Sequence, residues 1–233
     1  MKKVFLAVLV IGLGIQANAQ VSRFLDYGKS GLGIQGMAAM GEGFYGFGGS
    51  LGGSIKGNLD VEFVYNFNTD SKSLFNLTTD KATYGYYEGK LTYYLFREAI
   101  SPVVDVNFGV VGLVEYGDYQ DYKFIHSETG LEREYQGFLG GSVGLDASVN
   151  FRMKNGWNLQ PGIYMGFNIG SESETEGTTE FANGYHGAVS NLNLSLIKRT
   201  SEGNAFYIMA QQQAWTYSTY FYYMISMGYI FAL

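Results

Sequence analysis

The last fifteen residues, Thr219 to Leu233, constrain the fold of this chain more than any other stretch, because large apolar side chains recur at every second position: Phe221, Tyr223, Ile225, Met227, Tyr229, Phe231 and Leu233. Side chains of a β-strand point alternately to two faces, so this period of two predicts one strand with a continuous apolar face. Residues 203–233 carry no charge, which also suits an apolar helix. The polar run Gln211–Gln213 and the many β-forming residues favour a hairpin instead.

The same alternation recurs along the chain in about ten segments, each long enough for the ~9 to 11 residues of a membrane-spanning strand. They lie near residues 31–41, 44–56, 58–68, 83–97, 102–117, 134–152, 156–170, 185–198, 204–216 and 219–233. Short turns alternate with longer polar linkers at 68–82, 118–133 and 170–184. This order predicts an all-β fold, an up-and-down antiparallel transmembrane β-barrel of about ten strands, with eight as the alternative.

Alternation alone does not say which face of the barrel is outside. A soluble barrel of the lipocalin kind carries many Lys and Glu residues on its outer face. Here only 15% of residues are charged, against the usual ~25%, and the polar faces consist mainly of Gly, Ser, Asn and Gln. The apolar faces end in aromatic residues that suit interfacial girdles: Tyr93, Tyr116, Trp157, Tyr223 and Tyr229. We therefore expect the apolar faces to contact lipid. Parity is ambiguous only in 204–216.

The N-terminus has the pattern of a secretory signal peptide. Lys2 and Lys3 precede an apolar run, and Ala17–Ala19 forms a small-x-small cleavage site. We expect cleavage near Ala19, a short periplasmic lead over 20–30 and a single barrel domain over 31–233. Without the two leader lysines, 13 basic residues face 21 acidic ones, a net charge of −8. This charge argues against nucleic acid and anionic lipid as partners.

The C-terminal run Gly228-Tyr229-Ile230-Phe231-Ala232-Leu233 resembles the assembly signal of Gram-negative outer-membrane β-barrel proteins. The resemblance covers nearly all of the chain after the leader. It implies the cell outer membrane as location, outer-membrane lipid as partner, and the barrel assembly machinery as a partner through Gly228, Phe231 and Leu233. It specifies a class of protein and not an activity.

Inward parity collects most charges of the strands: Lys56, Asp60, Glu62, Glu88, Lys90, Asp105, Glu115, Asp146 and Arg152. The first interpretation is an internal salt-bridge network that fills a narrow barrel, because buried charges need partners. Lys56 and Asp60 flank one turn and are expected to be cross-strand neighbours. The alternative is an ion path or a set of catalytic carboxylates. Acids are in excess in either case, so a pore would prefer cations.

The glycine-rich stretch from Gly41 to Gly57 invites comparison with a phosphate-binding loop. No helical pattern follows it to direct amides at a phosphate. Gly46, Gly48 and Gly52 share the inward parity, so we interpret them as small residues that relieve crowding in a tight barrel.

Catalytic candidates are few, since the chain has two histidines and no cysteine. His186 and Ser190 lie four residues apart on a predicted strand, which places their side chains ~13 Å from each other. His126 lies in a surface linker. No cofactor or metal site is predicted.

We expect a non-enzymatic barrel, either a narrow cation-preferring channel or a structural surface protein. The alternatives are a rim-located hydrolase of lipid or peptide, and an adhesin or complex subunit that binds a surface ligand through 118–133 and 170–184.

Overall fold

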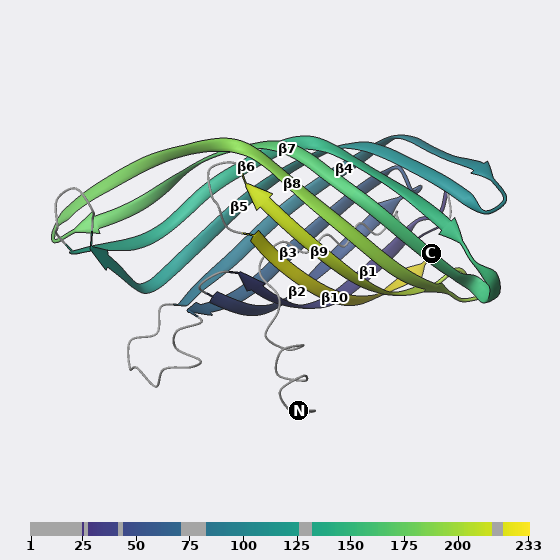
Figure 1. The fold of residues 1–233 in the computed structure, drawn as a ribbon, viewed down its shortest axis with the longest axis horizontal. Coiled ribbons are helices and arrows are strands. Elements are labelled where there is room, and N and C mark those ends of the chain that lie inside the picture. The colour runs from purple at the N-terminus through teal and green to yellow at the C-terminus, as the bar shows by residue number, and fades with distance from the viewer. Residues whose placement is uncertain (1–24, 26–27, 42–43, 71–82, 126–131, 216–220) are drawn as a thin grey trace, which may run out of the picture.

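The computed structural model describes residue 25 and residues 28–41, 44–70, 83–125, 132–215 and 221–233. They form one closed barrel of ten antiparallel strands (Figure 1). The strands are β1 (Gly31–Gly41), β2 (Phe44–Ile55), β3 (Leu59–Asp70), β4 (Thr83–Ser101), β5 (Val104–Ile125), β6 (Glu132–Arg152), β7 (Trp157–Glu176), β8 (Thr179–Arg199), β9 (Ala205–Trp215) and β10 (Phe221–Ala232). No helix in this described part of the chain is long and apolar enough to cross a bilayer.

Each strand pairs with its neighbours in sequence, and β1 closes the barrel against β10. The prediction of an up-and-down barrel is confirmed, and ten strands, not eight, are correct. Two of the short turns at one end contain residues with left-handed backbone, Lys56 and Gly57 between β2 and β3, and Asn155 and Gly156 between β6 and β7. The second turn includes the single-turn 3-10 helix η1 (Lys154–Gly156).

The predicted division into an apolar outer face and a polar inner face is confirmed along the described strands. Large apolar side chains on the outer face are strongly exposed, for example Val143 at 72% and Ile169 at 64%. The structure also shows which residues of β9 face inward and which face outward, a point on which the sequence was ambiguous. Tyr207, Met209 and Gln211 point inward, and Phe206 and Ile208 point outward. Of the five expected outer-face aromatics, Tyr93, Tyr116, Trp157 and Tyr223 are exposed and Tyr229 is half-buried.

Strands β4 to β8 are longer than expected. The linkers predicted at 118–133 and 170–184 are largely strand, because β5 continues to Ile125 and β7 to Glu176. The alternation of apolar residues stops where the strands leave the lipid-facing band, although backbone pairing continues, so periodicity could not reveal the extension. We name the extension of β5–β8 the raised wall, which comprises residues 118–125, 132–138, 170–176 and 179–188. Figure 1 shows it projecting beyond the shorter strands at the end opposite the C-terminus.

Candidate functional site

Side chains fill the interior of the barrel over much of its height. Asn66, Gln160 and Ser195 have no exposed surface, and Asp146 has 1%. Inward-facing glycines make room for large neighbours. A Cβ atom on Gly166 would lie 2.2 Å from the Tyr164 hydroxyl, and one on Gly140 or Gly170 would lie 2.3 Å from the Tyr185 hydroxyl. Tyrosine side chains therefore occupy the space that inward glycines leave, both within one strand and across strands, which supports the interpretation of the inward glycines as relief of crowding.

Five carboxylates and one amine are buried in this interior. Asp60, Glu62, Glu88, Glu115 and Asp146 are each at most 5% exposed, and so is Lys90. The inward positions of these six residues agree with the predicted parity.

Tyrosine and asparagine side chains hold the carboxylates in place. The Tyr86 hydroxyl lies 2.8 Å from Oε2 of Glu88 and 3.1 Å from Oε2 of Glu115. Asn168 Nδ2 donates to Oε1 of Glu115 at 2.8 Å, and the Tyr185 hydroxyl lies 3.4 Å from the same oxygen. A hydroxyl has one hydrogen, so Tyr86 bridges two acids while donating to one at a time.

Three of the expected inward charges lie outside this group. Lys56 is exposed in the β2–β3 turn, and the register pairs Asp60 with Ser54, so the expected Lys56–Asp60 pair does not form. The cause is the left-handed backbone of Lys56, which ends the alternation one residue early. Arg152 and Asp105 form an ion pair of 2.8 Å near the turns, where Arg152 is 42% exposed.

Leu25, which precedes β1, fills the barrel interior at the end with the short turns, a contact that the sequence did not indicate. Leu25 is 1% exposed and packs into an apolar cluster on the inner face of β8–β10: Ile197, Ala205, Tyr207, Met209 and Ile230. Arg97 donates Nη2 to the Leu25 carbonyl at 3.0 Å and Nε to Asn107 Oδ1 at 3.0 Å. Reasoning from alternation could not find this contact, since the apolar residues around Leu25 do not recur at every second position.

Aromatic side chains narrow the opposite opening, at the base of the raised wall. Tyr119 has its ring centroid 4.8 Å from that of Tyr84, 5.7 Å from Tyr135 and 6.0 Å from Phe138. The β5–β6 register shifts between Asp118 and Tyr122, next to Tyr119. Bulges of this kind redirect side chains.

Charges on the raised wall are partly paired. Arg133 contacts Glu174 at 3.1 Å and Glu176 at 2.9 Å and lies over the Phe181 ring at 4.4 Å. Hydrogen bonds to these carboxylates raise the pKa of Arg133, which stays charged. Burial, and then the neighbouring Glu174, raises the pKa of the Glu172 carboxyl.

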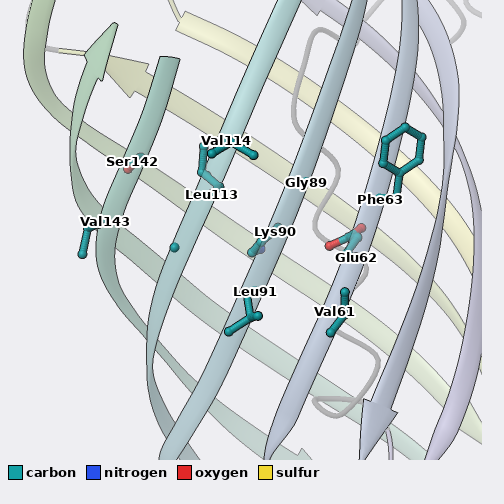
Figure 2. Close-up of a pocket in the computed structure, with 11 residues that line it drawn as sticks. Val61, Glu62, Phe63, Gly89, Lys90, Leu91, Leu113, Val114, Ser142 and Val143 are labelled. Carbon is teal, nitrogen blue, oxygen red and sulfur yellow. The ribbon is translucent and has the colours of Figure 1, made fainter. Parts of the chain in front are cut away.

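The outer face has a shallow apolar groove of about 570 Å³ over β3–β6 (Figure 2). Backbone at Gly89 and Gly112 lines it, and exposed side chains of Val61, Phe63, Leu91, Val114 and Val143 surround it. Glu62 and Lys90 also line the groove, although both residues are buried. The exposed apolar side chains around the groove place it on the lipid-facing surface.

The histidines do not form a catalytic pair with a serine in the described residues. His186 is exposed on the outer face, 6.2 Å from the Phe167 ring between ring centroids. Ser190 shares its parity four residues along β8. His126 lies outside the described residues. The described residues contain no group of three or more His, Asp or Glu side chains arranged to hold a metal ion.

No family model matches this sequence, and no curated protein resembles it significantly in sequence. Solved structures do resemble the fold. The translocator domain of the autotransporter NalP from Neisseria meningitidis matches with a TM-score of 0.51 and 10% identity over 91% of each chain. The outer membrane protease OmpT from Escherichia coli matches with a TM-score of 0.46 and 8% identity over 88% of this chain and 95% of its own.

Ail, the attachment invasion locus protein of Yersinia pestis, matches with a TM-score of 0.38 and 13% identity over 88% of this chain and 100% of its own. At these identities a likeness shows the fold and no activity. The closed barrel of ten strands, its apolar outer band and its polar, packed interior indicate the same class of fold as these structures, the outer-membrane β-barrel. The chain has the fold of a Gram-negative outer-membrane β-barrel protein.

Proposed function

We propose that this chain is a non-enzymatic structural surface protein of the outer membrane, with a closed lumen and a raised wall presented at the cell surface. The observation that carries the proposal is the packed interior. Side chains close the lumen at three heights: the Tyr119 cluster near the raised wall, Tyr164 and the carboxylates in the middle, and the Leu25 cluster near the short turns. A path for solutes would require several of these groups to move together.

Conductance in a planar bilayer tests the closure. We expect the refolded wild-type protein to give no steady current. Replacing Tyr119, Tyr164 and Leu25 by glycine removes one large side chain at each of the three heights, and this variant should conduct and prefer cations. A steady ohmic current through the wild-type protein would contradict a closed lumen. Heat-modifiable gel mobility checks that both proteins are folded.

Surface labelling tests the presentation of the raised wall, and the absence of native cysteine makes it simple. Thr178→Cys places a thiol in the exposed β7–β8 turn, and Glu202→Cys places one in the exposed β8–β9 turn at the other end. A membrane-impermeant maleimide applied to intact cells should label position 178 and spare position 202. The reverse pattern would invert the orientation and refute presentation of the wall.

A narrow cation-preferring channel is the second candidate, and the excess of buried acids favours it. Five carboxylates face one lysine in the lumen. The amides of Asn66, Asn68 and Gln213 have polar atoms without hydrogen-bond partners among the described residues, so they could solvate a passing ion. Cation-selective current in the wild-type protein would favour this candidate over the first. The rim hydrolase has less support, because His186 lies on the outer face, on the side of the strand away from the lumen.

A further inference from the structure

Charge is distributed unevenly over the barrel, although the chain as a whole is acidic. Most acids of the described residues lie in the lumen or on the raised wall, the latter including Asp118, Glu132, Glu134, Glu172, Glu174, Glu176 and Glu180. At the end with the short turns, the acids among the described residues are Glu98, Asp105 and Glu202, and Asp105 is paired with Arg152. Exposed lysines gather at this end. The net charge of −8 therefore does not describe the surface near these turns.

Exposed Lys154 and half-buried Lys198 lie near an outward tryptophan where the apolar band ends. The outward stripe of β8 runs from Leu192 through Leu194 and Leu196 to Lys198, whose Cα partner on β7 is Trp157. Lys198 Nζ lies 5.4 Å from the centroid of the Trp157 ring and donates to the backbone oxygen of Asn155. Lys154 is exposed in the same turn as Asn155. We call Lys154, Trp157 and Lys198 the basic rim patch.

We propose that the basic rim patch binds the headgroups of anionic phospholipids in the leaflet nearer the short turns. The patch is continuous with the lipid-facing band, since Leu159 and Leu196 lie one step further along the same outward stripes. Amphipathic Trp side chains prefer the headgroup level, and lysines extend their ammonium groups to that level. A phosphodiester with a net negative charge supplies the acceptors that two ammonium groups need. Neighbouring charges do not cancel the two ammonium groups of the patch. Arg152 and Arg199 are also basic, and the acidic Glu202 lies in the next turn and not in the patch.

Fluorescence of Trp157 gives a local test, because the chain has only one other tryptophan, Trp215. In a Trp215→Phe background, the protein is refolded into vesicles of phosphatidylcholine mixed with brominated phosphatidylglycerol or brominated phosphatidylcholine. Preferential quenching by the brominated anionic lipid measures its enrichment at the patch. Each lysine near an anionic surface is expected to contribute roughly fivefold, so Lys154→Gln with Lys198→Gln should abolish most of the preference.

A matched control replaces two exposed lysines at the same end but away from the tryptophan, Lys29→Gln with Lys56→Gln. This variant loses the same charge and should keep the preference. Equal quenching of Trp157 by the two brominated lipids in the wild-type protein would overturn the proposal, because it would show no enrichment of anionic lipid. Equal loss of the preference in both double variants would also overturn it, in favour of a diffuse attraction. If the patch double variant fails to fold, Lys154→Gln alone should reduce the preference roughly fivefold, and an unchanged preference would refute it.

Discussion

Glycine on the inner face of this barrel acts by leaving space for a specific neighbour, as β2 shows. A Cβ on Gly48 would lie 1.9 Å from Asn66 Oδ1 and 2.2 Å from the backbone oxygen of Tyr65. Gly36, on the outer face of the adjacent strand β1, has nothing within 4 Å of the same position. The two glycines are therefore used differently, although both occur in strands.

We predict opposite effects for the two alanine substitutions. Gly48→Ala should lower the free energy of unfolding by ~1 to 3 kcal/mol, because backbone and side chain must both shift to avoid the new methyl group. Gly36→Ala should leave stability unchanged or raise it by up to ~1 kcal/mol, because alanine loses less backbone entropy. Urea unfolding from detergent or vesicles measures both. Equal destabilisation would show that crowding is not the reason for Gly48.

The outward face makes a second prediction at the scale of single residues. Val143 is 72% exposed beside the apolar groove, so Val143→Arg places a charge in hydrocarbon and should cost ~2 to 4 kcal/mol if it lies near the midplane. Ser171 is also exposed and outward, but it lies on the raised wall beyond the apolar band. Ser171→Arg should therefore change unfolding in vesicles by less than ~0.5 kcal/mol. Similar costs at both positions would contradict the lipid-facing assignment.

At the scale of elements, the raised wall differs from the spanning strands because it pairs backbone without an apolar outer face. Its inner side carries Glu172, whose pKa is raised by burial and by Glu174. An acid with a raised pKa in the folded state binds its proton more tightly there than in the unfolded state. Ionisation of Glu172 therefore destabilises the folded wall. The wall becomes more stable as the pH falls and the Glu172 carboxyl takes up its proton.

We predict that Glu172→Gln stabilises the wall near neutral pH, with no gain below about pH 4, where the carboxyl is protonated in both states. Limited proteolysis at 170–184 as a function of pH measures this local stability. Glu180→Gln, at an exposed site on the same hairpin, is the control and should show little dependence on pH. A gain at Glu172 that persisted at low pH would rule out ionisation as its cause.

At the scale of the whole molecule, the barrel closes where its first strand, β1, pairs with its last strand, β10. β1 and β10 pair from Gly31 and Ala232 to Gly41 and Tyr222, and the Leu233 amide donates to the Ser30 oxygen at 3.0 Å. Phe231 takes no part in the packed interior, since it faces outward and is 50% exposed. Its apolar side chain is therefore available to the assembly machinery that the C-terminal pattern implies.

We predict that Phe231→Asn lowers the amount of barrel in the outer membrane of cells but leaves refolding into detergent largely intact. Phe206→Asn is a matched control, because Phe206 is also outward and lies on β9 near the same end, 38% exposed. Fractionation of cells combined with heat-modifiable gel mobility gives both quantities. Equal losses in cells for the two variants would point to lipid contact and away from an assembly signal.

The strands, their faces and the antiparallel order could be read from the sequence alone, because a period of two is a local property of each segment and lipid demands a continuous apolar stripe. Residues 157–169 show this, with every predicted face correct in β7. The tertiary structure decided how separate strands combine. Tyr86 meets Glu115 from another strand, Leu25 closes the lumen from outside the barrel's own strands, and Lys56 leaves the predicted charge group through its backbone conformation. The uneven distribution of charge also depends on the tertiary structure. The sequence gives only the net charge, which is a sum over residues. The basic rim patch exists because the strand register places Lys198 beside Trp157 at the edge of the apolar band.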